Sequence, residues 1–535
     1  MSSVKKEPID LNVMDFKQMF DSEELSICLN AMYEADVQDD MLALIFEANK
    51  TTYFAVKTPN EVTEKTTVTN KILQGDVLAP LLSSNMVDRH IGLSAMNTNN
   101  VYLYKNKVKI PPLTMQDDTI GISTCGFRSA KMNSFMNTRS NIMSLQFGRD
   151  KCEKMHVGKK KRNVDICVNG RVDAWKDKII KDNLGNDKLV DEYIGKEIIK
   201  SVEEKMYLGN IIQSNGKNEK NIQAKINKAV GSVENIISAI TERPYGCHTF
   251  KAALLMRQGL MLGGMLTNAE AWINVTETDI KRLTMPDTMS HRKLLSTYGN
   301  PSRVFMSLEL GVVPVKFVLM AKRTNMLHYI LNENTNSTMR QVFEELKIDS
   351  RKGDSCSLVQ KDLKDLDIDV NETAIENYSK SQWKIIVKNA VRKSAFNYLS
   401  SENLLLKNTK EIFFEELKTS EYLLDNRNTA LSKIIFSLRS KTFDIMDWQQ
   451  WKYFDNLCVA CEVKKETMTH LLKCSSYENV PCENKWEEIK RSNKERQFEI
   501  AQKASTRQKL RRQIIDKFGA GHPLNPPGSR APGSC

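Results

Sequence analysis

The chain has 535 residues, of which 41% are hydrophobic and 27% are charged, so it is long and apolar enough to bury the cores of several domains. Its formal net charge of +12 suits a polyanionic partner, although a solvated lysine-rich surface gives the same balance. The absence of an apolar run of about 18 residues, of a secretory signal and of regularly spaced cysteines predicts no membrane span, no export and no disulfide framework, and hence an intracellular protein of the nucleus and cytoplasm.

The first 150 residues mix predicted helices with short predicted strands. Apolar residues recur at helical spacing over residues 22–50 and again over 132–147. Alternating segments at 51–57 and 101–109, rich in residues that favour β-structure, predict strands between them. This mixture predicts an α+β fold, an antiparallel sheet with helices, rather than a doubly wound parallel sheet.

A polar, charge-rich insert covers residues 159–204, and its glycine and asparagine content predicts a flexible excursion. It begins with the basic run Lys-Lys-Lys-Arg at 159–162. Such a run is typical of a nuclear-import signal or an RNA contact, and equally of a solvated loop.

The chain is predicted to be mostly helical beyond the insert. The first of these helices carries an apolar stripe that includes Ile222 and Ile226, with Lys225 and Lys228 off the stripe. An apolar face with a basic flank suits a helix that follows a nucleic-acid backbone, but an ordinary core helix has the same stripe. The end of the chain, residues 519–535, holds four prolines and four glycines and is predicted to be disordered.

Two adjacent carboxylates, Asp117 and Asp118, stand between apolar residues in the string LTMQDDTIG at 113–121. A tight turn between two short strands would bring both carboxylates to one place, where a cation relieves their repulsion. Hard oxygen ligands in that arrangement select Mg²⁺. A surface turn rich in aspartate is the plain alternative, and the neighbouring motifs decide between the two.

Four further segments stand in a fixed order around this turn. They are VMDFKQMFDS at 13–22, QGDVLAPLL at 74–82, LQFGRDKCEKM at 145–155 and MYLGNII at 206–212. Together with the Asp-Asp turn they resemble palm motifs A to E of the reverse transcriptases of non-LTR (LINE-type) retrotransposons. The resemblance covers about residues 10–240, and it is the ordered series that is specific, whereas each single motif is not.

The resemblance implies an RNA-directed DNA polymerase, a nucleotidyltransferase that uses an RNA template, a DNA primer and dNTPs in a right-hand fold. Two-metal nucleotidyl transfer needs carboxylates from two separate chain segments at one point. By their match to motifs A and C, Asp15 and Asp117 are the implied bridging Mg²⁺ ligands, and Asp118 contributes less directly. The backbone carbonyl of Phe16 is implied to complete the coordination.

The other motifs imply contacts with the substrates. Phe20 matches the aromatic residue beside the sugar of the incoming nucleotide, although Met19 could take that place and core packing is the plain alternative. Lys151 matches the motif D lysine, a candidate general acid for the leaving pyrophosphate, and its plain alternative is an exposed lysine. The implied template- and nucleotide-binding turn is Gln74-Gly75, and the implied primer grip is Tyr207-Leu208-Gly209.

The chain departs from the family pattern at three places. Gln116 stands where motif C usually has alanine, and Ala79 where motif B usually has serine before the proline. Only 14 residues precede Asp15, whereas the fingers of the family need on the order of 100 residues. We therefore expect a 5′-truncated copy or a partial gene model that binds nucleic acid and polymerises poorly.

The pattern Cys458-x2-Cys461-x8-His470-x3-Cys474 is the second strong signal. A Cys-x2-Cys turn puts two thiolates on one ion, and His-x3-Cys places two more ligands one helical turn apart. Four such ligands predict a closed, structural Zn²⁺ site, and the alternative is four unconnected residues. The pattern resembles the C-terminal Cys-Cys-His-Cys module of some LINE-type proteins, which contacts nucleic acid.

The predicted organisation is a palm followed by helical regions and a zinc knuckle. Its boundaries are 1–212 for the palm with the insert 159–204, 213–300 for a helical thumb, 301–450 for a helical linker, 451–480 for the zinc knuckle, 481–518 for a basic helical tail and 519–535 for a disordered tail. Two other hypotheses stand beside the polymerase: a non-catalytic nucleic-acid-binding protein derived from a decayed or co-opted element, and a helical scaffold with a chance Asp-Asp pair. The carboxylates discriminate between them, because a pure binder has no need of Asp15, Asp117 and Asp118.

Overall fold

The computed structural model has an α+β fold in which helices predominate, as the sequence predicts. The chain divides into two compact units: Met1–Asn221 with Glu333–Ser357, and Ile222–Asn332 with Leu358–Cys535. The structure describes residues 9–518 except for 60, 70, 73–75, 99–100, 106, 125, 149, 159–166, 169–177, 182–186, 191–196, 199, 242–248, 297–299, 349, 351–352, 426–428, 444–456, 478–488 and 490–492. The basic run at 159–162 and the predicted disordered tail therefore lie outside the described residues.

The first unit is built on a small mixed sheet in the order β13-β8-β1-β7-β6, antiparallel throughout except where β13 meets β8. Its strands are β1 (Ile9–Asp15), β6 (Leu113–Met115), β7 (Asp118–Ser123), β8 (Glu153–Val157) and β13 (Lys200–Ser201). Antiparallel pairs join β2 (Thr51–Phe54) to β3 (Thr66–Thr69), β4 (Tyr102–Tyr104) to β5 (Val108–Ile110), β14 (Glu204–Tyr207) to β15 (Asn210–Gln213), and, in the insert, β9 (Cys167–Val168) to β12 (Glu197–Ile198) and β10 (Lys178–Lys181) to β11 (Asp187–Val190). The helices of this unit are α2 (Met19–Ser22), α3 (Leu25–Tyr33), α4 (Asp39–Asn49), α5 (Ala79–Val87), the π-helix η1 (Asp88–Leu93), α6 (Ser94–Asn97), α7 (Gly126–Ile142) and α14 (Thr338–Ile348).

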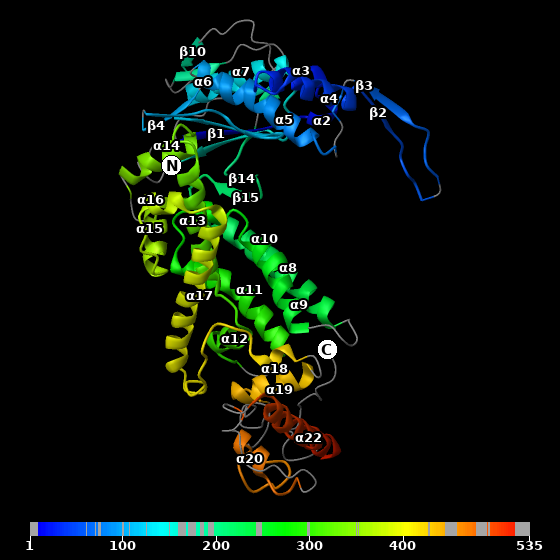
Figure 1. Ribbon diagram of the computed structural model, residues 1–535, viewed down its shortest axis with the longest axis vertical. Helices are drawn as coiled ribbons and strands as arrows, with labels where there is room; N and C mark the ends of the chain where they lie inside the picture. Colours follow the sequence, from blue (N-terminus) through cyan, green and yellow to red (C-terminus); the bar gives the residue numbers. More distant parts are fainter. Residues whose placement is uncertain are drawn as a thin grey trace. The chain divides into compact units, whose positions relative to one another are not determined.

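The central strand β1 is buried on both faces. Because successive side chains of a strand alternate, Leu11 and Val13 lie on one face, and Asn12 and Met14 lie on the other. Helix α7 covers the second face, where the Asn12 amide donates to the carbonyl of Ser129 at 3.1 Å and the Ser129 hydroxyl donates back to Asn12 at 2.9 Å. Figure 1 shows helices α3 to α7 gathered on this side of the sheet.

Helix α14 covers the opposite face together with the β4–β5 hairpin. Val342 and Leu346 pack against the apolar cluster that contains Leu11 and Val13, and Lys107 of the hairpin pairs with Glu345 at 3.0 Å. The sequence places α14 in the helical linker 301–450, whereas in the structure this segment groups with the first unit. The physical reason is that the apolar face of α14 completes the core of the first unit, a long-range contact that local spacing does not encode.

The second unit is helical. Its elements are α8 (Glu219–Thr241), α9 (Thr249–Met256), the π-helix η2 (Arg257–Leu262), α10 (Gly263–Met265), the 3₁₀ helix η3 (Ala269–Ala271), α11 (Glu277–Leu295), α12 (Arg303–Leu310), α13 (Val315–Asn332), α15 (Ser355–Asp365), α16 (Glu372–Asn377), α17 (Lys380–Leu404), α18 (Glu421–Leu424), α19 (Thr429–Arg439), α20 (Met468–Lys473) and α22 (Lys494–Phe518), of which α8 and α15 also reach into the first unit. One hydrophobic core joins residues of the predicted thumb, linker and zinc knuckle, for example Ile226, Leu319 and Leu471. These regions therefore share a core instead of forming separate domains.

Two local predictions need correction. Lys225 is only 7% exposed, because it lies three residues after Ile222 and so on the apolar face of α8; burial lowers its pKa. The helix predicted over 132–147 is α7, which ends at Ile142. Phe147 instead forms a β-bridge with Phe16, and the two rings stack with centroids 4.4 Å apart.

No single helix in the described part of the chain is long and apolar enough to cross a membrane, and one bent pair, α12 with α13, passes that test by length and composition.

Glu23 is a buried carboxyl whose ionisation couples the stability of the chain to pH. Its side chain is inaccessible, and burial raises its pKa from 4.5 to about 7, while a hydrogen bond from Ser83 acts in the opposite direction. The stability that comes from the protonated carboxyl is therefore complete below pH 4.5 and is lost as the pH rises through about 7. We expect the free energy of unfolding to fall by on the order of 3 kcal/mol across this range.

Urea unfolding of the full chain at a series of pH values, followed by circular dichroism, measures this effect. Glu23→Gln should remove most of the pH dependence, because the amide keeps a hydrogen-bonding group at Ser83 without a proton to lose. A variant that retains the slope of the wild type would show that another group is responsible.

Candidate functional site

The Asp-Asp pair lies at a two-residue turn between β6 and β7. Met115 pairs with Asp118, so Gln116 and Asp117 form the turn, and Gln116 takes the left-handed φ of 55° that hairpin turns of this length require. The tight turn that the sequence predicts between two short strands is therefore confirmed. The Gln116 side chain is half-buried there.

Asp15 at the end of β1 stands directly opposite Asp118. The two residues are partners in the antiparallel register of β1 and β7, and the backbone N–H of Phe16 donates to the carbonyl of Asp117 at 3.4 Å. Strand alternation places Asp15 on the same face as Val13, opposite the face that α7 covers. Carboxylates from two distant segments of the chain thus come together at one end of the sheet.

The charges around this end of the sheet are unevenly balanced. Burial, followed by the negative charges of Asp117 and Asp15, raises the pKa of Asp118, while Lys205 and Lys151 act against the rise. Lys151 forms an ion pair with Asp15 at 3.0 Å, and this contact raises the pKa of the lysine. Crowded carboxylates of this kind attract a cation, and one ammonium group already lies among them.

The segment that carries Lys151 is fixed to the end of β1 by its backbone. The N–H of Gly148 donates to the carbonyl of Asp15 at 2.8 Å, and the N–H of Lys17 donates to the carbonyl of Gln146 at 2.8 Å. The Asp15 N–H lies 3.5 Å from the sulfur of Cys152. These contacts place Lys151 beside the carboxylates.

The predicted primer grip is a two-residue hairpin turn near the same carboxylates. Tyr207 pairs with Asn210, and between them Leu208 and Gly209 both take left-handed conformations, with φ of 45° and 73°. Burial and then the charge of Asp118 raise the pKa of Tyr207 to about 12. The tyrosine is therefore close enough to Asp118 to sense its charge.

The other residues predicted for this site either pack in the core or lie outside the described residues. Phe16 is buried against Phe147, and Met19 is buried as well. Phe20 is half-buried and packs against the helix-side core, which agrees with the packing interpretation of this residue. Gln74 and Gly75 lie outside the described residues.

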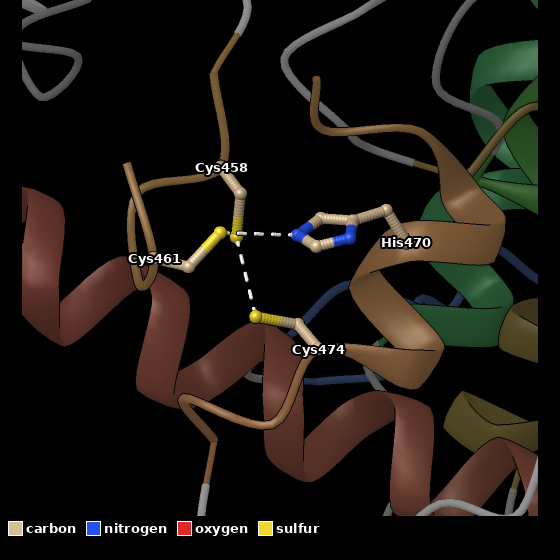
Figure 2. A group of neighbouring side chains, drawn as sticks. All are labelled: Cys458, Cys461, His470 and Cys474. Atoms are coloured by element: carbon tan, nitrogen blue, oxygen red, sulfur yellow. Dashed lines mark hydrogen bonds between the residues drawn. The ribbon is translucent and has the colours of Figure 1, made fainter. Parts of the chain in front are cut away.

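The four predicted zinc ligands meet at one point. Figure 2 shows the side chains of Cys458, Cys461, His470 and Cys474 directed toward one another, and their ligand atoms all lie within 4.8 Å of each other. The Cys458 and Cys474 sulfurs are 3.8 Å apart, and the Cys461 sulfur is 3.3 Å from Nε2 of His470. A tetrahedral ion with Zn–S bonds of about 2.3 Å separates two sulfurs by about 3.8 Å, so the residues fit a metal such as zinc.

Local structure explains why these side chains converge. The first two cysteines lie in a turn closed by the β-bridge between Leu457 and Lys465. Of the other two ligands, His470 lies in the last turn of α20 and Cys474 directly follows the helix. The Thr467 hydroxyl caps the start of α20 by accepting from the His470 N–H at 3.1 Å. His470 and Cys474 therefore lie one helical turn apart, as the sequence predicts.

Protonation of the cysteines differs across the cluster. Burial raises the pKa of Cys458 to about 12. At Cys461, burial is outweighed by hydrogen bonds from the backbone of Val463 and Lys464 and from His470, so that its pKa is lowered to about 6. Because the thiolate is the form that binds metal, loading the site at neutral pH would release a proton from Cys458.

Helix α22 holds the Cys/His cluster in the core of the second unit. Arg507 donates to the carbonyls of Leu471 at 2.8 Å and Cys474 at 3.2 Å, and Arg511 forms a buried ion pair with Glu466 at 2.8 Å. The sequence assigns α22 to a basic tail, and these two arginines were not anticipated as supports of the cluster. In the sequence, their four-residue spacing puts both arginines on the face of α22 that also carries the buried Ala504. This spacing is the feature that indicates a buried role for them.

The carboxylate site and the Cys/His cluster differ in how tightly their atoms are grouped. In the described part of the chain, Cys458, Cys461, His470 and Cys474 are the one set of three or more metal-binding side chains grouped within 4.8 Å. The oxygens of Asp15, Asp117 and Asp118 do not form such a set. Comparison with known proteins adds no assignment, because no family model and no curated protein matches the sequence.

Proposed function

We propose that the first unit is the palm of an RNA-directed DNA polymerase similar to the reverse transcriptases of non-LTR retrotransposons. The observation that carries the proposal is the pairing of Asp15 with Asp118 across β1 and β7, beside the Asp117 turn. The proposal draws further support from Lys151 and Tyr207, which come from two more motifs and lie at the same end of the sheet.

The proposed roles follow from the chemistry of these groups. Asp15 and Asp117 would hold two Mg²⁺ ions, which supply charge neutralisation for the attacking 3′-hydroxyl and the leaving pyrophosphate. Lys151 carries a proton beside the carboxylates and would donate it to the pyrophosphate. The hairpin of Leu208 and Gly209 would hold the primer end.

The ion pair between Lys151 and Asp15 leads to a prediction about divalent ions. Because the ammonium competes for an oxygen of Asp15, Lys151→Ala should strengthen Mn²⁺ binding by about fivefold, and Asp117→Asn should weaken it by about tenfold. Titration followed by the electron paramagnetic resonance of free Mn²⁺ measures both effects.

Asp36→Asn is the matched control for the Mn²⁺ titration. It removes one exposed carboxylate of the same unit at a left-handed φ of 61°, which asparagine tolerates. Equal Mn²⁺ affinity in the wild type and all three variants would remove the ion-binding role of the carboxylates.

A non-catalytic nucleic-acid-binding protein is the second candidate. The observation that favours it is that Lys151 already neutralises Asp15, so that the site is stable without a divalent ion. Primer extension separates the two candidates: extension that Asp117→Asn abolishes supports the polymerase, whereas salt-sensitive RNA binding without extension supports the binder.

A further inference from the structure

Helices α13 and α17 pack side by side in the second unit and border two adjoining hollows. The Trp383 N–H of α17 donates to the carbonyl of Thr324 in α13 at 3.2 Å, and this buried contact fixes the pair. The hollows have volumes of about 580 and 290 Å³, and Asn325 and Lys384 line both. We refer to the two hollows together as the α13–α17 groove.

The larger hollow combines apolar walls with a basic rim. Its lining contains no acidic side chain. Its walls include Leu262, Leu310, Val318, Val387 and Val391, and its cations are Arg257, Lys322, Lys384, Lys388 and Arg392. An apolar site with a rim of this kind selects a ligand that carries negative charge along an apolar body.

Two of these cations are already neutralised inside the protein. Arg257 pairs with Asp287 at 2.6 Å, and Lys322 pairs with Glu270 at 3.2 Å. Lys384 and Lys388 are exposed, and within the described residues neither has an ion-pair partner. These two lysines, together with Arg392, which donates only to the neutral carbonyl of Leu417, are therefore the charges that the larger hollow offers to an external anion.

The exposed cations of α17 form a regular row. Lys380, Lys384, Lys388 and Arg392 follow one another at intervals of four residues, and each lines one or both hollows. A helix rises 1.5 Å per residue, so the Cα atoms in this row are spaced about 6 Å apart. That spacing is close to the separation of successive phosphates in an extended single strand of nucleic acid.

The smaller hollow contributes aromatic surface and an unsatisfied acceptor. Tyr329 is 49% exposed beside it, and the Tyr378 and Trp383 rings stack with centroids 6.1 Å apart. The Oδ1 atom of Asn325, which lies between the hollows, is buried without a hydrogen-bond donor. An exposed aromatic face stacks on a base.

We propose that the α13–α17 groove binds single-stranded nucleic acid, with phosphates along Lys380, Lys384 and Lys388 and an unpaired base at Tyr329. The proposal rests on the proposed function only in choosing nucleic acid among anionic ligands. It assigns a site that uses none of the carboxylates of the first unit.

Fluorescence anisotropy of a labelled single-stranded RNA of about 15 nucleotides tests the groove in the full chain. The double variant Lys384→Ala with Lys388→Ala should bind about tenfold more weakly at low salt. The slope of log K against log salt should also fall in magnitude by about 1.4, because each lost phosphate contact contributes about 0.7 on a single strand. Tyr329→Ala should weaken binding about tenfold and leave the slope unchanged, because stacking releases no counterions.

The matched control is the double variant Lys361→Ala with Lys364→Ala, which removes two exposed lysines of α15. Thermal unfolding checks that each variant is folded. If the groove variant and the control bind RNA with equal affinity and slope, the proposal is overturned. It is also overturned if the groove variant loses binding only to phosphatidylserine vesicles, which would identify a membrane surface. Primer extension is measured separately on the same variants, so failure of polymerisation is distinguishable from failure of the groove.

Discussion

Replacing Cys458 by serine is expected to release the bound metal and unfold the C-terminal part of the second unit. Cys458 is completely buried, and its sulfur lies 3.8 Å from that of Cys474. Closed sites with four protein ligands contribute their binding free energy directly to folding, and small zinc modules gain about 10–16 kcal/mol in this way. Because neighbouring helices also support the cluster, we expect the loss in the full chain to be smaller but at least about 3 kcal/mol.

The expected unfolding extends beyond the cluster itself. Arg507 of α22 donates to the backbone at Leu471 and Cys474, so loss of the metal removes the acceptors that position this helix. Arg511 and Glu466 would then be left as a buried pair without a fixed geometry, which is costly. Limited proteolysis should therefore cut α22 as well as the segment between Cys461 and His470.

Elemental analysis and urea unfolding measure the two parts of this prediction. The purified wild type should hold one zinc per chain, and both Cys458→Ser and a strong chelator should remove it. The matched control is Cys356→Ala, which alters a buried cysteine outside the cluster and should keep the metal. A wild-type protein without zinc, or a Cys458→Ser variant as stable as the control, would contradict the structural role of the cluster.

The Cys/His cluster and the Asp-Asp turn could be predicted because their determinants are local. The spacing of Cys458, Cys461, His470 and Cys474 is itself a turn and a helical repeat, so the sequence contains most of the geometry. The Asp117 turn follows in the same way from two short apolar segments around a polar pair. Spacing alone does not predict that Asp15 pairs with Asp118. The expectation that the two meet comes from the resemblance carried by the ordered motifs.

The features that were missed depend on packing between distant segments. Lys225 falls within a sequence window that suggests a basic flank, yet the phase of α8 turns it inward. Arg511 falls in a segment whose charges predict a basic tail, yet in the structure it is buried and paired with Glu466. Helix α14 falls in the predicted linker, and no local signal indicates that Val342 and Leu346 complete the core of the first unit. In each case the tertiary partner, and not the residue type, decides the environment.

Asp117→Asn is expected to abolish any polymerase activity of the chain. The substitution keeps the size of the side chain and removes the negative charge that the proposed Mg²⁺ site requires. Asp117 lies next to Asp118, whose pKa is raised by burial and then by that same charge. Loss of a group that stabilises charge in the transition state costs about a hundred- to a thousandfold in rate, which takes a slow wild-type reaction below detection. Asp36→Asn removes an equal charge from an exposed turn of the same unit and should leave the rate unchanged.

Extension of a labelled DNA primer on an RNA template, with dNTPs and Mg²⁺, is the measurement that tests the polymerase assignment most directly. We expect slow, Mg²⁺-dependent extension by the wild type and by Asp36→Asn, and none by Asp117→Asn. Extension that persists in Asp117→Asn would show that these carboxylates are not the catalytic groups. No extension by a wild-type chain that demonstrably binds the template would contradict the polymerase and leave the nucleic-acid-binding protein as the function of this fold.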